Sequence, residues 1–174
     1  MPRDVVPDGF AEFVAARSGA LLRAAWLLTG DPGAAEDLLQ TALAEVWPRW
    51  RRVAAGGSPE AYVRRVMLST YLSGRRRRWR GELPTADLPD RADTGATADP
   101  AGRAGARDAV RRALQRLSPQ QRAVVVLRYL EDLSVEETAN ALGCSAATVK
   151  VQAGRALAVL RRDPDLGLAP VGEV

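Results

Sequence analysis

The fold of this chain is decided by residues 134–162, which read SVEETANALGCSAATVKVQAGRALAVLRR. Ser134 and Glu137 have the spacing of a capping box, in which each side chain bonds a backbone N–H that a new helix leaves unpaired. Gly143 ends that helix, since glycine readily takes the left-handed conformation of a C-terminal cap. Ser145 caps a second helix directly afterwards. Two helices joined by so short a turn must cross steeply, so the stretch predicts a helix-turn-helix.

The second helix of this pair has two contrasting faces. One is an apolar stripe made of Val149, Ala153, Ala156, Leu157 and Leu160. The other carries small residues and a few long hydrogen-bond donors, namely Ala147, Thr148, Val151, Gly154, Arg155 and Arg162, with Lys150 and Gln152 on its flanks. Small residues allow a helix to enter the major groove closely, and arginine can bind guanine through two hydrogen bonds. The alternative is an ordinary helical hairpin with a solvated basic face.

Composition limits the classes of protein that the chain can represent. It has 174 residues, of which 47% are hydrophobic, so we expect packed domains rather than disorder. The net charge is +4, and the positively charged residues are almost all arginine. This is weak evidence for a nucleic-acid partner. Cys144 is the only cysteine and histidine is absent, which excludes an intramolecular disulfide and the usual zinc ligands. We therefore expect no metal and no cofactor.

The same survey argues against an enzyme and against a membrane protein. With no histidine, one cysteine and scattered carboxylates, no set of acid, base and nucleophile is recognisable, so we expect no catalytic residues. No apolar run is long enough to cross a bilayer, and residues 1–10, MPRDVVPDGF, lack a signal-peptide core. We therefore expect a soluble, cytoplasmic protein without membrane insertion.

The N-terminal half predicts three helices, over about residues 9–29, 32–50 and 59–80. Asp31 before Pro32, and Ser58 before Pro59, are start signals that combine a capping side chain with proline at the first helical position. Pro48 should kink or fray the second helix, because it cannot donate to the preceding turn. We expect a loop over residues 51–57. The third helix should end in Arg75, Arg76, Arg77, Arg78 and Trp79. Phosphates would relieve the repulsion within this run, and the tryptophan could stack on a base; the alternative is a solvated helix end.

Residues 82–105 change abruptly to Pro, Gly, Ala, Thr and Asp, which predicts a flexible linker. Beyond it we expect a helix over 106–117, a core helix over 119–130 that starts with a capping box at Ser118 and Gln121, and then the helix-turn-helix. The predicted fold is all-α, with two small helical domains, 8–81 and 106–163, joined by the linker 82–105.

Three separated segments resemble one family, the bacterial RNA polymerase sigma factors of the extracytoplasmic-function type, close to its sigma-E-like members. They are AAEDLLQTAL (34–43), VMLSTYLSGRRRRWRGE (66–82) and LSPQQRAVVVLRYLEDLSVEETANALGCSAATVK (117–150). They resemble regions 2 and 4 of such factors, in the right order. The resemblance implies a transcription initiation factor that binds core RNA polymerase and promoter DNA, with an anti-sigma factor as a candidate further partner.

The resemblance also implies roles for individual residues. The surface facing the beta-prime clamp helices of the polymerase would consist of Asp37, Gln40, Leu43 and Trp47, although plain core packing is an equal alternative for the last two. The second domain would bind the beta flap. The minus-10 element would be read by the loop 53–58, with Gly56, Gly57 and Ser58, and by Arg65, Ser69, Arg75, Arg76, Arg77, Arg78 and Trp79. The minus-35 element would be read by Thr148, Lys150, Val151, Gly154 and Arg155.

A different reading remains open from the sequence. A helix-turn-helix also serves transcriptional regulators that are not polymerase subunits, and such a protein would bind DNA through the same second helix. This hypothesis would not explain the arginine-rich helix end or the segment 34–43. Transcription by core polymerase, with and without the chain, separates the two hypotheses.

Overall fold

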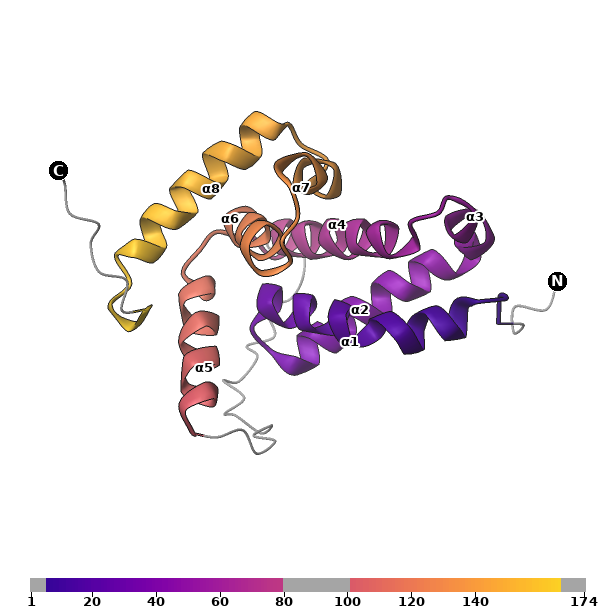
Figure 1. The fold of residues 1–174 in the computed structure, drawn as a ribbon, viewed down its shortest axis with the longest axis horizontal. Coiled ribbons are helices and arrows are strands. Elements are labelled where there is room, and N and C mark those ends of the chain that lie inside the picture. The colour runs from indigo at the N-terminus through magenta and orange to yellow at the C-terminus, as the bar shows by residue number, and fades with distance from the viewer. Residues whose placement is uncertain (1–5, 80–100, 167–174) are drawn as a thin grey trace.

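The computed structural model describes residues 6–79 and 101–166 of the chain, and this part contains helices and turns but no strand (Figure 1). The elements are α1 (Phe10–Thr29), α2 (Pro32–Val46), η1 (Trp47–Arg49), α3 (Trp50–Ala55), α4 (Pro59–Trp79), α5 (Ala101–Gln115), α6 (Pro119–Val125), η2 (Val126–Leu130), α7 (Val135–Leu142), α8 (Ala146–Arg161) and η3 (Pro164–Leu166). The all-α prediction is confirmed.

The first domain consists of α1 to α4, and its three longer helices, α1, α2 and α4, begin where the sequence predicts. The side chain of Asp31 accepts a hydrogen bond from the backbone N–H of Ala34 at 2.7 Å, which caps α2 with Pro32 in its first turn. Helix α2 ends at Val46, and a single 3-10 turn containing Pro48 follows, in agreement with the expected disruption. Helices α1, α2 and α4 pack on one another around buried residues such as Leu21, Leu39 and Met67.

The prediction of a loop over residues 51–57 is wrong, because most of this segment is helical. Helix α3 occupies Trp50–Ala55. Trp50 and Val53, three residues apart, are both buried, and the indole Nε1 of Trp50 donates to the carbonyl of Asp8 at 2.9 Å. The ring of Phe10 packs edge-on against this indole, with the two ring centroids 5.1 Å apart. The gain from burying these two side chains on one helical face explains why this short segment folds as a helix. Of the predicted loop, only Gly56 and Gly57 lie outside a helix, in the turn that leads to Ser58.

The second domain consists of α5 to α8. Helix α5 begins at Ala101, so the end of the predicted linker is helical; linker residues 82–100 lie outside the described residues. The capping box at Ser118 and Gln121 opens α6 as predicted. The predicted core helix over 119–130 changes at Val126 into one π-helical turn, in which the N–H of Glu131 bonds the carbonyl of Val126 at 2.9 Å. Tyr129 and Leu130, which lie in this turn, are about half exposed.

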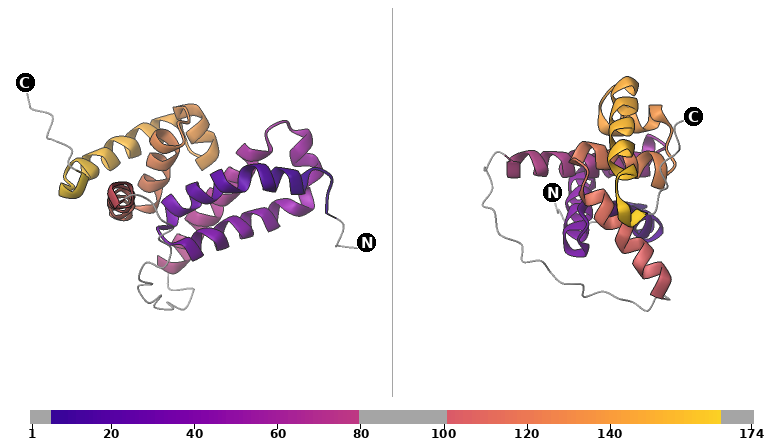
Figure 2. Two further views of the ribbon diagram at one scale, coloured as in Figure 1. Left: turned by 60° about the horizontal axis from the view of Figure 1, so that its bottom comes forward. Right: turned by 90° about the vertical axis from the view of Figure 1, so that its left-hand side faces the viewer.

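The two domains lie against each other rather than apart (Figures 1 and 2). Helix α7 packs on α4, and both α5 and α6 pack on α1. Buried residues of both domains, including Leu28 and Tyr71 from the first and Leu114 and Val126 from the second, form one continuous hydrophobic cluster. The sequence predicted two domains but gave no information about this packing.

Candidate nucleic-acid interface

The helix-turn-helix is built by local hydrogen bonds that the sequence specifies. The backbone N–H of Ser134 donates to the Glu137 carboxylate at 2.7 Å, and the N–H of Glu137 donates to the Ser134 hydroxyl at 3.0 Å. The bond from the Ser134 backbone N–H lowers the pKa of the Glu137 carboxyl, because it stabilises the charged form. Gly143 has φ 64°, the left-handed conformation of a helix C-cap, and Ser145 caps α8 by accepting from the N–H of Thr148 at 3.1 Å.

Helix α8 separates a buried face from an exposed one, as its pattern predicts. The buried residues are Val149, Ala153, Ala156 and Leu160. On the opposite face Lys150, Val151, Gly154 and Arg155 are exposed, with Val151 at 49%. Thr148 is half-buried, and its hydroxyl lies 2.9 Å from that of Ser145, so it also contributes to the cap. A Cβ placed on Gly154 would meet no atom within 4 Å, which leaves this face open to close approach.

A second group of predicted site residues lies at the start of α4 in the first domain. Gly56, Gly57 and Ser58 form the exposed turn before this helix, and Gly57 has φ 79°. Arg65 and Ser69, one helical turn apart, are both exposed. The backbone of Arg75, Arg76, Arg77, Arg78 and Trp79 continues α4, whereas their side chains lie outside what the structure describes.

The predicted polymerase-binding residues of α2 and η1 divide into two pairs. Asp37 and Gln40 are exposed and available to a partner. Leu43 and Trp47 are half-buried and pack against the hydrophobic cluster, and Trp47 meets Phe10 edge-on at 4.9 Å. Both Leu43 and Trp47 therefore contribute to the core, while part of each side chain remains accessible.

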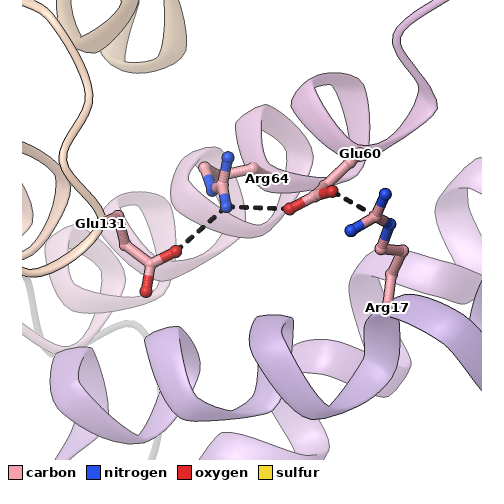
Figure 3. Close-up of polar contacts among 4 residues, drawn as sticks. All are labelled: Arg17, Glu60, Arg64 and Glu131. Atoms are coloured by element: carbon pink, nitrogen blue, oxygen red, sulfur yellow. Dashed lines mark hydrogen bonds and ion pairs between the residues drawn. The ribbon is translucent and has the colours of Figure 1, made fainter.

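The polar residues that connect the two domains are not among those predicted from the sequence. Arg64 of α4 bonds Glu131 of the second domain at 3.0 Å and Glu60 at 3.1 Å, and Glu60 also pairs with Arg17 of α1 at 3.3 Å (Figure 3). Beside this chain of charges, an open groove of about 630 Å³ separates the two domains. Ser58 and Arg65 line it from the first domain, and Asp132, Glu137 and Asn140 line it from the second.

Arg122 forms the other polar link and is only 4% exposed. Its guanidinium donates to the carbonyls of Leu28 (2.7 Å), Leu114 (2.7 Å), Gln115 (3.1 Å) and Leu117 (3.2 Å), and to the hydroxyl of Tyr71 (3.2 Å). Leu28 lies in the last turn of α1, while Leu114 and Gln115 lie in the last turn of α5. A cation is stabilised there because the last carbonyls of a helix lack intrahelical partners and carry partial negative charge. A lone arginine beside AVVVL could have been flagged from the sequence, but its partners could not.

The part of the chain that the structure describes offers no group of three His, Cys, Asp or Glu placed to hold a metal ion. Nor does it contain a helix long and apolar enough to span a membrane. The described part does contain a helix-turn-helix whose second helix, α8, has an open, basic face. It is joined to a helical domain in which Arg65 is exposed. These features define a two-domain, all-helical DNA-binding protein.

Comparison with known proteins narrows this class to a family. Residues 13–81 match the model of sigma-70 region 2, and residues 107–160 match that of sigma-70 region 4. The RNA polymerase sigma-E factor of Streptomyces coelicolor is 47% identical over 154 residues, which cover 88% of this chain and 85% of the relative. The sigma-E factor of Streptomyces avermitilis is equally similar, with 88% and 84% covered. The chain therefore belongs to the sigma-70 family of RNA polymerase sigma factors, within its extracytoplasmic-function group.

A solved structure agrees with this fold. The sigma factor RpoE from Bartonella quintana, determined in complex with the anti-sigma factor NepR, matches with a TM-score of 0.70 at 22% identity. The match covers 92% of this chain and 98% of the other. At this level of identity the likeness concerns the fold alone.

Proposed function

We propose that this chain is an alternative sigma factor that binds core RNA polymerase and directs it to promoters with a minus-10 and a minus-35 element. The observation that carries the proposal is the presence of both sigma regions, in order, on a fold whose second domain exposes a small-residue, basic face on α8. Because RNA polymerase works in the cytoplasm of bacteria, we place the protein there.

The minus-35 element is assigned to the exposed face of α8. Lys150 and Arg155 supply long donors that can reach base edges or phosphates, and Val151 offers an apolar contact to a thymine methyl group. Gly154, between them, lets the helix approach the groove without steric obstruction. We expect Thr148, at the N-terminal end of α8, to contact a phosphate or a base.

The minus-10 element is assigned to the turn 56–58 and to α4. Reading one strand of melted DNA requires a base to leave the stack, at a cost of a few kcal/mol, so a preformed cationic surface is needed nearby. Arg65 and Ser69 follow the exposed turn on the same helix, and the run Arg75–Arg78 with Trp79 extends it. We expect this run to bind phosphates and to stack on a base.

The contact with core polymerase is assigned to α2 and η1 in the first domain. Exposed Asp37 and Gln40 provide its polar part, and the accessible edges of Leu43 and Trp47 provide its apolar part. The second domain would bind the beta flap. An anti-sigma factor is a reasonable regulator, because the solved sigma factor RpoE was determined in complex with one.

Transcription in vitro tests the proposal directly. Core polymerase should begin transcripts at promoters of this factor only when the chain is added. Arg155→Ala and Lys150→Ala should each weaken promoter binding by about 1–3 kcal/mol while core binding stays unchanged. Alanines at Arg75–Arg78 should reduce the salt dependence of promoter binding. Arg23→Ala, which removes an exposed arginine from α1, is the matched control. It should change neither the strength nor the salt dependence of promoter binding.

Association with core polymerase distinguishes a sigma factor from the alternative, a helix-turn-helix regulator. A helix-turn-helix regulator that is not a polymerase subunit would bind DNA but neither join the core enzyme nor change its start sites. Such a regulator would leave the match to sigma region 2 unexplained. If the core enzyme ignores the chain, the proposed function is wrong.

A further inference from the structure

Lys150 differs chemically from every other cationic side chain of the protein. Among the 25 lysine and arginine residues of the sequence it is the only lysine, and it lies exposed on the face of α8 that we assign to the minus-35 element. A lysine amine becomes a nucleophile when it loses its proton, whereas a guanidinium stays protonated in proteins. A reagent that attacks amines therefore has a single side-chain target here, and that target belongs to the proposed DNA surface.

We propose that Lys150 is a modification site, at which an acyl donor of the acyl phosphate or acyl thioester class forms an amide and thereby weakens the minus-35 contact. The inference rests on the proposed function, because the lost charge matters to DNA binding only if α8 reads a promoter. It concerns one contact alone, since no other side chain of the sequence carries an amine.

The surroundings of Lys150 leave its amine free to react. No carboxylate among the described residues pairs with it, whereas Arg64, for example, pairs with Glu131 at 3.0 Å. The exposed positions one helical turn away are Ala147 and Gly154, which have no long side chain. A Cβ placed on Gly154 would meet no atom within 4 Å, so a donor molecule has room to approach along this face.

The acylation needs no group other than the donor. The neutral amine nitrogen attacks the acyl carbon and forms a carbon–nitrogen bond, while the bond from that carbon to the phosphate oxygen or the thioester sulfur breaks. The leaving phosphate or thiol takes up the proton that the nitrogen loses. The product is an uncharged amide with one N–H, in place of an ammonium group with three donors.

This product removes a contact on which the proposed minus-35 reading depends. An ammonium that neutralises a DNA phosphate releases condensed counterions, and this gain in affinity disappears with the charge. The acyl group also adds bulk next to Gly154, on the face that has to enter the groove closely. The polymerase-binding residues Asp37 and Gln40 and the arginines of α4 carry no amine, so core binding and the minus-10 contact should persist. Acylation therefore affects one of the two promoter contacts and not the other.

Treatment of the purified chain with acetyl phosphate, and of a second sample with acetyl-coenzyme A, tests the proposal. Peptide mass spectrometry should find Lys150 acetylated, and it distinguishes this residue from an N-terminal amine. The sample in which Lys150 reacts identifies the class of donor. When the treated chain is bound to core polymerase, its promoter affinity should fall about tenfold, and the slope of log affinity against log salt should be less steep by about 1. The affinity for core polymerase itself should not change. Untreated Lys150→Gln, which is neutral, should show a similar loss of promoter affinity.

Two variants serve as controls, and each is compared with its own untreated sample. Lys150→Arg keeps a positive charge but has no amine at this position, so treatment should not alter its promoter affinity. Lys150→Arg combined with Arg23→Lys moves the amine to an exposed position of α1. This second variant should be acetylated at position 23, and its promoter affinity should be the same before and after treatment.

The proposal is overturned if Lys150 stays unmodified in both samples, or if the acetylated parent binds the promoter as tightly as the untreated one. An equal loss of affinity in treated Lys150→Arg would also overturn it, because the effect would then arise elsewhere in the protein. The reactivity of Lys150 is measured by mass and needs no promoter. An untreated chain that core polymerase ignores would refute the proposed function, while the mass spectra would still decide whether Lys150 is the reactive site.

Discussion

Replacing Arg122 by methionine removes one of the charged groups that join the two domains while keeping a long apolar stem. In the folded protein the change leaves the carbonyl of Leu28 and the hydroxyl of Tyr71 without this donor in the first domain. It also removes the donor from the carbonyls at the end of α5 and before α6. Methionine can fill most of the space but can donate no hydrogen bond.

The expected loss follows from these bonds and from the cost of burying the cation. A hydrogen bond to a charged group contributes about 1.5–3 kcal/mol net, and several such bonds end at this guanidinium. Their sum overstates the effect, since a buried cation also carries a desolvation penalty that the variant avoids. Breaking a buried charged network from one side typically costs about 3–5 kcal/mol. We expect a loss of that size, against a total of about 5–15 kcal/mol for a folded domain.

Urea denaturation measures the loss with two probes. Circular dichroism follows helices in both domains, whereas all four tryptophans, at positions 26, 47, 50 and 79, lie in the first. Both transitions should move to lower urea, because Arg122 bonds Leu28 and Tyr71 across the boundary. The fluorescence shift should be the smaller one.

Arg155→Met makes the same chemical change at an exposed position of α8 and should cost no more than about 0.5 kcal/mol. A loss in Arg122→Met no greater than in this control would refute the reasoning. So would a fluorescence transition that stays in place while the dichroism transition moves, because the domains would then unfold independently.

Two further predictions concern the caps of α7. The pKa of Glu137 is lowered in the folded state, so its carboxylate contributes stability that is fully present above the ordinary value of 4.5 and is lost as pH falls through the folded-state pKa. The amide of Glu137→Gln can keep the capping bond but carries no charge. The variant should therefore unfold at a lower temperature than the parent at neutral pH and at the same temperature in acid. A difference in unfolding temperature that does not depend on pH would contradict this. Gly143→Ala should lower the free energy of unfolding by about 1 kcal/mol, because φ is 64° and a Cβ there meets only open space, so the cost is conformational. Gly143→Asn should cost less, and equal stability of all three proteins in urea would show that the left-handed cap is not needed.

The sequence by itself determined the local features of this protein. The caps at Asp31, Ser118, Ser134 and Ser145 are formed by residues within three positions of their partners, so a short window of sequence contains the whole interaction. The exposed and buried faces of α8 follow in the same way from a period of about 3.6 residues. Helix α3 was missed because the burial of Trp50 depends on Asp8 and Phe10, far away in the sequence.

Only the tertiary structure decided how the domains meet. Arg122 and Leu28 are 94 residues apart, and Arg64 and Glu131 are 67 apart, with the linker between the members of each pair. No periodicity or capping rule relates such positions, because their contact depends on how two already folded surfaces fit. Each arginine seen alone predicts a solvated charge or a phosphate ligand. The fold placed one against the free carbonyls of two helix ends and the other against a carboxylate, which made both of them links between the domains.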